Sequence, residues 1–366
     1  MYSDSDIESA VAAGALSPDA AGALRNFVAG NRATPAVDEE HFRLLTGFND
    51  IFVSIAALIL LVAVAWIGDA IPPKIDGNGP SPMSGLLVAA SAWGLAEFFT
   101  RKRRMALPSI ILLLAFILGV AAVAGVGMVL AVGVENLQNQ SAPADYIAIG
   151  AALTGALAAW LHWRRFRVPI TVAAGAASVV ILIMSLIRSG VEDSGEQSTI
   201  LLSVALLLGI GVFLFAMWWD GSDPRRETRR SDVAFWLHLL AAPLIVHPVF
   251  SLLGLTDGNA TVLEALAVVL VYVLLGLTAL AIDRRALLVS ALAYVLWALS
   301  DLFERFGAVE LNVAFTALVI GSALLLLSAF WHTARRAVVR PLPPGLQARL
   351  PVLDRTVSER TVAAAA

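Results

Sequence analysis

The chain has 366 residues, of which 59% are hydrophobic and only 14% are charged, and its mean hydropathy is +0.81. Soluble domains carry about a quarter charged residues, so this composition excludes an ordinary soluble protein and predicts that most of the chain lies in lipid. The absence of cysteine excludes a disulfide framework and a thiol nucleophile. A net charge of −3 says little about partners, and no nucleic acid is expected.

Residues 1–36 predict a small cytoplasmic helical hairpin. Asp6–Gly14 and Pro18–Asn31 read as two short helices, each with one apolar face, and Ser17 before Pro18 is typical of a helix start. So short a hairpin has too little core to stand alone, so we expect it to lean on the membrane region or to bind a cytoplasmic protein. Residues 37–49 then predict an amphipathic helix along the membrane surface.

Residues 50–331 predict an all-α membrane domain of about ten transmembrane helices, because apolar stretches of about 20 residues follow one another. These stretches are Asp50–Gly68, Met83–Thr100, Met105–Gly133, Tyr146–Trp163, Val168–Ile187, Ile200–Trp219, Val233–Gly254, Val262–Ile282, Ala286–Phe306 and Asn312–Trp331. Residues 332–366 predict a disordered cytoplasmic tail, since prolines and scattered arginines replace the apolar pattern.

Arginine pairs recur where apolar stretches end. The five pairs are Arg103/Arg104, Arg164/Arg165, Arg225/Arg226, Arg284/Arg285 and Arg335/Arg336. Loops on that side hold 13 Lys and Arg, whereas the opposite loops hold only Lys74 and Arg188, with Arg305 at a span end. Because loops rich in Lys and Arg stay in the cytoplasm, the asymmetry together with an even number of spans predicts that both termini are cytoplasmic.

Two further patterns concern how the spans pack. At an offset of 61 residues, Arg103–Pro108 lies over Arg164–Pro169, with the arginine pair and a proline in common. This match favours either a duplicated hairpin or two independent solutions to membrane insertion. Small residues at four-residue spacing, at Ala151, Gly155 and Ala159, predict close helix packing.

Most tryptophans lie near predicted span ends, as expected for rings that prefer the headgroup zone. They are Trp66, Trp160, Trp163, Trp218, Trp219, Trp236 and Trp331. Trp93 and Trp297 lie deeper, so interfacial anchoring does not explain them.

The segment from Ile7 to Ala21, together with the tryptophan and arginine residues at span ends, resembles a family of uncharacterised bacterial membrane proteins in which a short helical hairpin precedes a multi-span region. The resemblance implies a bacterial inner-membrane location. It implies no activity for any residue, and residues 37–49 depart from the layout of that family.

The strongest candidate site is a polar stripe on the ninth predicted span. Tyr294, Trp297, Asp301, Glu304 and Arg305 project within about 100° of one another at 100° per residue. His247 on the seventh span and Glu264 on the eighth are expected to reach a similar depth. A polar residue inside a membrane span indicates a functional site, so these residues predict a hydrated pocket in the outer half. The alternative is that the acidic groups approach the headgroups and His247 makes one structural hydrogen bond.

No metal or cofactor is expected, because the chain carries no phosphate loop, zinc motif or serine elbow. His238 and His247 are nine residues apart and fall on opposite helix faces, so they cannot chelate one metal. Glu97 is expected to pair with Arg101, four residues later. Three function classes stay open: transport of a small solute or ion, a scaffold or sensor that binds a cytoplasmic partner, and, third, an enzyme acting on a lipid-linked substrate. An enzyme is the least favoured of these, and the oligomeric state stays open.

Overall fold

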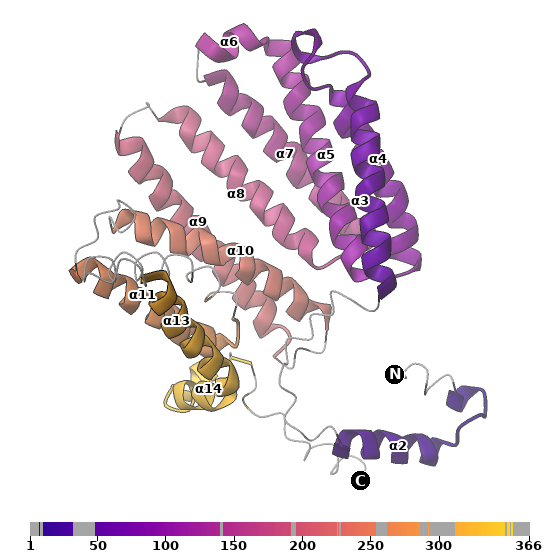
Figure 1. Cartoon of the computed structure of the whole chain (residues 1–366), viewed down its shortest axis with the longest axis vertical. Coiled ribbons are helices and arrows are strands. Elements are labelled where there is room, and N and C mark those ends of the chain that lie inside the picture. The colour runs from indigo at the N-terminus through magenta and orange to yellow at the C-terminus, as the bar shows by residue number, and fades with distance from the viewer. Residues whose placement is uncertain are drawn as a thin grey trace. The chain divides into compact units, whose positions relative to one another are not determined.

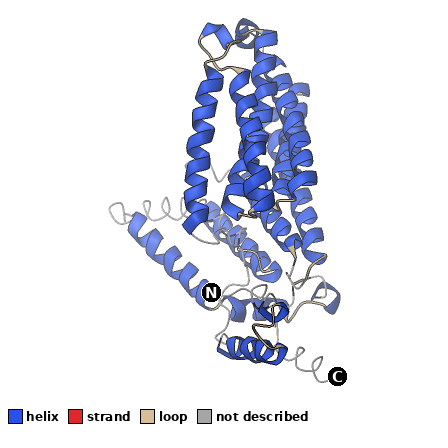
Figure 2. Ribbon diagram, turned by 90° about the vertical axis from the view of Figure 1, so that its right-hand side faces the viewer, coloured by secondary structure: helices blue, strands red, loops and turns tan. Residues whose placement is uncertain are grey.

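A computed structural model describes Ile7 and residues 10–31, 48–139, 142–191, 195–224, 226, 228–253, 262–285, 288, 292, 312–347, 350–351 and 353. The described residues form helices and turns, with no strand among them (Figures 1 and 2). The chain divides into two compact units, Met1–Leu44 and Leu45–Ala366.

The first unit contains one complete described helix, α2 (Pro18–Asn31). The hydroxyl of Ser17 accepts a hydrogen bond from the backbone N–H of Ala20 at 3.1 Å, which satisfies one of the free N–H groups of the first turn. The preceding helical turn ends at Gly14, whose φ of 70° favours a residue without a Cβ. The predicted start of the second helix is therefore confirmed, while the packing of a hairpin stays a prediction. The interfacial helix predicted for residues 37–49 lies outside the described residues except for its last two, which belong to the next helix.

The second unit is a helical membrane domain. Its long helices are α3 (Phe48–Asp69), α4 (Pro82–Ala96) extended by the π-helical turn η2 (Glu97–Lys102), α5 (Ala106–Val132), α7 (Ala142–Phe166), α8 (Ile170–Gly190), α9 (Gly195–Gly221), α10 (Arg229–Leu252), α11 (Val262–Ile282) and α13 (Asn312–Ala329). Short helices are η1 (Ile75–Gly77), α6 (Val134–Asn139), α14 (Trp331–Val339) and α15 (Pro344–Gln347). Seven of the described helices, α3 to α10 without α6, are long and apolar enough to cross a membrane.

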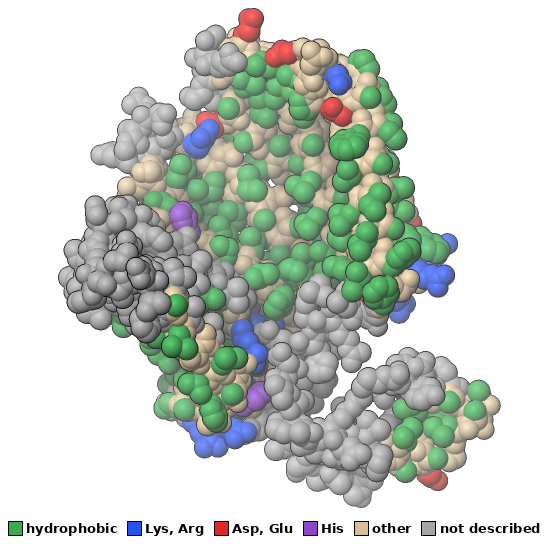
Figure 3. All heavy atoms as spheres, in the orientation of Figure 1, with side chains coloured by type: hydrophobic (Ala, Val, Ile, Leu, Met, Phe, Trp, Pro, Cys, Tyr) green, Lys and Arg blue, Asp and Glu red, His purple; other side chains and the backbone are tan. Residues whose placement is uncertain are grey.

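Large apolar side chains cover the flanks of these helices, and charged side chains gather at the two ends (Figure 3). On α3, for example, Phe52 is 65% exposed and Trp66 is 77% exposed. Such a surface is unfavourable in water and matches the hydrocarbon core of a bilayer. The first seven predicted spans are thereby confirmed as helices that are long and apolar enough to cross a membrane. Helices α11 and α13 cover the eighth and tenth predicted spans, and the ninth, 286–306, lies outside the described residues apart from Leu288 and Leu292, so the count of ten stays a prediction.

Small residues bring neighbouring spans into backbone contact. A Cβ added to Gly85 of α4 would lie 2.6 Å from the carbonyl oxygen of Gly119 of α5, and a Cβ on Gly209 of α9 would lie 2.8 Å from the backbone of Leu244 of α10. A Cβ added to Gly155 of α7 would lie 3.3 Å from the hydroxyl oxygen of Ser178 of α8. The close packing predicted from small residues is therefore confirmed for α7 and α8 and extends to the other pairs.

The turns 97–105, 167–169, 222–228 and 283–285, together with α14, form one end of the membrane domain, here called the arginine face. Each turn contains a non-glycine residue with positive φ: Arg104 (55°), Arg167 (52°), Arg226 (53°) and Asp283 (57°). This conformation is uncommon for residues with a Cβ, so its recurrence marks a shared turn geometry. Arg104 and Arg167 are 63 positions apart, so the equivalent turn residues do not coincide with the 61-residue sequence match.

The C-terminal segment differs from the disordered tail predicted for residues 332–366. Residues 331–339 form α14, in which Trp331, Arg335 and Val339 are buried, and the guanidinium of Arg335 donates to the carbonyl of Pro351 at 2.6 Å. The prolines that favoured disorder lie after α14, where they end a helix instead of preventing one. Residues 354–366 lie outside the described residues.

A buried polar cluster at the arginine face

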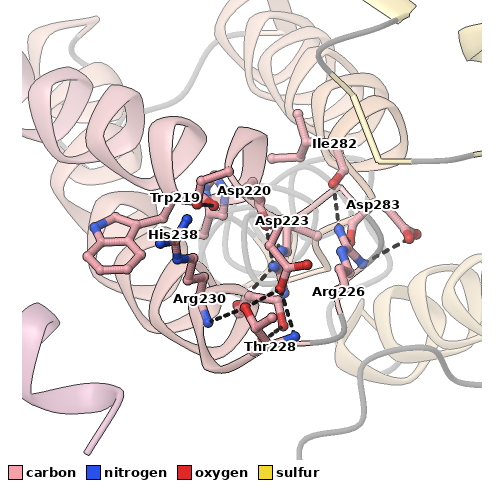
Figure 4. Close-up of polar contacts among 12 residues, drawn as sticks. Trp219, Asp220, Asp223, Arg226, Thr228, Arg230, His238, Ile282 and Asp283 are labelled. Carbon is pink, nitrogen blue, oxygen red and sulfur yellow. Dashed lines mark hydrogen bonds and ion pairs between the residues drawn. The ribbon is translucent and has the colours of Figure 1, made fainter. Parts of the chain in front are cut away.

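Asp220, His238 and Arg284 form a buried cluster at the arginine face. Asp220 is 2% exposed at the end of α9, His238 is fully buried on α10, and Arg284 lies in the turn after α11. The Asp220 carboxylate accepts from Arg284 Nη2 at 2.5 Å and Nε at 3.3 Å, and its Oδ2 lies 2.9 Å from His238 Nε2. Arg284 also donates to the carbonyl of Ser231 at 3.0 Å. One carboxylate thus joins α9, α10 and the turn after α11 through a guanidinium and an imidazole. Figure 4 shows Asp220 beside His238.

The contact with Asp220 fixes the tautomer of His238. A carboxylate only accepts hydrogen bonds, so Nε2 carries the proton in the neutral ring and Nδ1 holds a free lone pair. Nδ1 is buried and has no hydrogen-bond partner among the described residues. The centroid of the Phe213 ring lies 5.3 Å from that of His238. The arrangement gives His238 one protonatable nitrogen in an apolar setting.

Asp283 is a second junction of the arginine face. Its carboxylate accepts from Arg226 Nη1 at 3.0 Å and from the indole N–H of Trp331 at 2.7 Å, and Arg335 Nε lies 3.8 Å away. Burial alone would raise the pKa of Asp283, but Arg226, Arg335, the Trp331 hydrogen bond and Arg284 outweigh it and hold that pKa below its ordinary value. Asp283 therefore stays ionised and ties α14 to the turn between α9 and α10.

The turn between α9 and α10 is held by its own polar contacts. Asp223 Oδ2 accepts from the backbone N–H of Thr228 at 2.9 Å and from its hydroxyl at 2.7 Å, while Thr228 Oγ1 accepts from the N–H of Arg230 at 3.2 Å. Thr228 is thus the N-cap of α10, which starts four residues before the predicted span at Val233. This turn carries Arg226 toward Asp283 (Figure 4).

An exposed ion pair connects α4 and α7 at the same face. Glu97 accepts from Arg165 through both carboxylate oxygens, at 2.6 and 3.0 Å, and from Arg101 at 3.3 Å. The predicted pair with Arg101 is confirmed, and Arg165 adds a contact between helices that the sequence did not indicate. Exposed pairs of this kind contribute little to stability.

In three of the arginine pairs, one arginine lies over an aromatic ring. Arg103 lies 5.5 Å from the Phe98 ring, Arg164 lies 5.0 Å from Trp160, and Arg285 lies 4.8 Å from Trp331. The arginine pairs therefore have local binding partners in addition to any role in setting orientation.

His162 is a second buried histidine but lacks a carboxylate partner in the described part of the chain. Its ring packs among Trp93, Phe116 and Phe166, with ring centroids 4.5 to 6.2 Å apart. Its Nδ1 lies 3.4 Å from the Thr171 hydroxyl, and its Nε2 has no described partner. This aromatic cluster also explains the depth of Trp93, which interfacial anchoring did not.

The predicted polar stripe of the ninth span lies outside the described residues: Tyr294, Trp297, Asp301, Glu304 and Arg305. Glu264 is in the first turn of α11, and its side chain is not described. His247 is on α10 with an exposed side chain, whereas His238 is buried, so the two do lie on different helix faces. The predicted pocket in the outer half stays a prediction.

The buried cluster was missed because its members look like ordinary span ends in the sequence. Asp220 and Arg284 each lie in a loop that an orientation argument already explained. One available signal was that Asp220 directly follows an apolar span, so its carboxylate had to find a partner near the membrane. Comparison of the chain with protein-family models, curated proteins and solved structures finds no match.

Proposed function

We propose that this protein moves a small solute or ion across a bacterial inner membrane and that His238 takes up and releases a proton during the cycle. The observation that carries the proposal is the buried Nδ1 of His238, which has no partner in the described part of the chain, while its other nitrogen is bound to Asp220. A buried histidine and carboxylate in a membrane domain carry a desolvation cost, and proton relays are one of the functions that such residues serve.

The geometry of α10 supports this role. It is the most buried of the candidate spans and contains Pro243 and Pro248, which remove backbone hydrogen bonds and favour bending. His247 lies nine residues beyond His238, about 13 Å along the helix. The two histidines lie on different faces of α10, so the proposed proton site consists of His238 with Asp220.

The proposal includes the finer topology. We place ten spans, with residues 286–306 as the ninth, and we place the arginine face in the cytoplasm because its turns hold most of the Lys and Arg. Both termini are then cytoplasmic. The polar stripe at Asp301 would line the outer half of the same pathway.

The test replaces His238 with Gln, whose amide can still donate to Asp220 but cannot be protonated. Purified protein in liposomes containing pyranine is energised with a potassium gradient, and internal pH is followed as pools of sugars, amino acids and inorganic ions are added. We expect a solute-dependent pH change that His238→Gln abolishes. The matched control is His162→Gln, another buried histidine without a carboxylate, which should keep the response. Equal proton movement by wild type and His238→Gln would contradict the proposal.

A scaffold or sensor is the second candidate, because Met1–Leu44 separates as a compact unit of its own. A unit that does not belong to the membrane domain is suited to holding a cytoplasmic protein. Deleting residues 1–36 distinguishes the two functions. If the protein is a transporter, the truncated form keeps solute-dependent flux. If it is a scaffold, the truncated form still inserts into the membrane but no longer rescues a strain from which the gene has been deleted.

A further inference from the structure

Helix α14 has one face on the protein and one face exposed. Trp331, Arg335 and Val339 recur every four residues and are buried, and this side packs beneath α11. The opposite side is exposed and includes Arg336 and Arg340. The exposed side of this amphipathic helix is therefore basic.

The charge of this segment is one-sided. From Trp331 to Leu353 the sequence contains four arginines and no acidic residue. Asp283, which follows the last residue of α11, compensates part of this positive charge through its contact with the buried Arg335. The exposed guanidinium groups of Arg336 and Arg340 add to a basic surface that suits a phosphate group.

The position of α14 suits a lipid as the source of that phosphate. One residue separates α14 from α13, an apolar helix whose Leu325 and Leu326 side chains are exposed on its surface. The backbone leaves helical geometry at Phe330, with φ −108° and ψ 19°, and the chain turns there (Figure 1). Phe330 is 60% exposed and Leu346 is 52% exposed, so apolar groups lie in the chain before and after the two arginines. Guanidinium groups between exposed apolar side chains are typical of a helix at the headgroup level.

We propose that the exposed side of α14, through Arg336 and Arg340, binds the headgroup of an anionic phospholipid of the leaflet at the arginine face. The apolar side chains of Phe330 and Leu346 contact the acyl chains. This site does not depend on transport, since it requires only that α13 crosses the bilayer.

The test titrates delipidated full-length protein in neutral detergent with phosphatidylglycerol or phosphatidylcholine and counts bound lipid by native mass spectrometry. Wild type should bind phosphatidylglycerol more tightly. Because each basic residue near an anionic surface contributes about fivefold in affinity, Arg336→Gln with Arg340→Gln should lower phosphatidylglycerol affinity by roughly 30-fold and leave phosphatidylcholine unchanged. Arg336→Lys with Arg340→Lys should retain most of the affinity.

Two controls make the result specific to α14. Arg103→Gln with Arg164→Gln removes two exposed arginines from other turns of the same face and should leave the affinity within about twofold of wild type. Ala337→Glu places a carboxylate on the exposed side without removing an arginine and should also weaken phosphatidylglycerol binding, which covers the case in which the double glutamine variant fails to fold. Inorganic phosphate at millimolar concentration should not displace the lipid. Equal affinity of wild type and the Ala337→Glu variant, or an equal loss in the Arg103 and Arg164 control, would overturn the proposal.

Discussion

Removing the Asp220 carboxylate tests the energetics of the buried cluster most directly. Asp220→Ala leaves the guanidinium of Arg284 buried without its bidentate partner and leaves His238 Nε2 without an acceptor. Breaking a buried ion pair by removing one member costs about 3–5 kcal/mol, because the remaining charge stays desolvated. We expect a loss of unfolding free energy of that size.

The same reasoning predicts a rescue. Replacing Arg284 with Met in the Asp220→Ala background removes the stranded charge and keeps much of the side-chain volume. The double variant should therefore be more stable than Asp220→Ala alone, although it also loses the bond from Arg284 to the Ser231 carbonyl. A favourable coupling between the two substitutions is the distinctive result.

The assay is reversible unfolding in mixed detergent micelles with increasing dodecyl sulfate, followed by the fluorescence of the nine tryptophans. Glu97→Gln is the control, because it removes an ion pair that is exposed at the same face and should change stability little. The reasoning is refuted if Asp220→Ala loses less than about 1 kcal/mol or if Arg284→Met brings no recovery.

Three further predictions concern other parts of the membrane domain. Asp283→Asn should abolish a pH-dependent part of the stability. Because the folded pKa of Asp283 is lowered, its contribution is complete above the ordinary carboxyl pKa of about 3.9 and is lost as pH falls through the lowered value. The free energy of unfolding, measured from pH 7 to pH 3, should therefore decline less steeply in the variant than in wild type. Gly85→Val should destabilise the contact of α4 with α5 by about 1–3 kcal/mol or more, whereas Gly94→Ala, where an added Cβ meets nothing within 4 Å, should be neutral in the same unfolding assay. His162→Phe removes a buried Nε2 that has no described partner and adds a ring that suits Trp93 and Phe166, but it also removes the 3.4 Å contact of Nδ1 with the Thr171 hydroxyl. The melting temperature should therefore stay close to that of wild type, and a value well below it would contradict this.

The membrane helices were largely predictable from the sequence. The ends of the seven helices that match predicted spans differ from the predicted ends by at most five residues, the largest difference being at the start of α9. At the start of α10 the difference is four residues, because Thr228 caps the helix and extends it through Arg229 and Arg230. Local hydropathy predicted the spans because lipid forces each one to satisfy its own backbone hydrogen bonds.

The candidate site was not predictable in the same way. Asp220 and Arg284 are 64 positions apart, and Arg226 and Asp283 are 57 apart. Nothing local in the sequence specifies which arginine of a pair binds a distant carboxylate and which lies over an aromatic ring. The prediction for the ninth span used depth along a helix alone, and depth does not specify which helices are neighbours.

The sequence by itself determined the solvent of this protein and the span boundaries, because transfer of an apolar segment of about 20 residues into lipid depends on composition within that segment. Only the tertiary structure decided which buried charges are paired. That choice depends on the packing of α9 against α10 and on the position of the turn after α11, since a carboxylate such as Asp220 is stabilised only where a guanidinium arrives at hydrogen-bond distance.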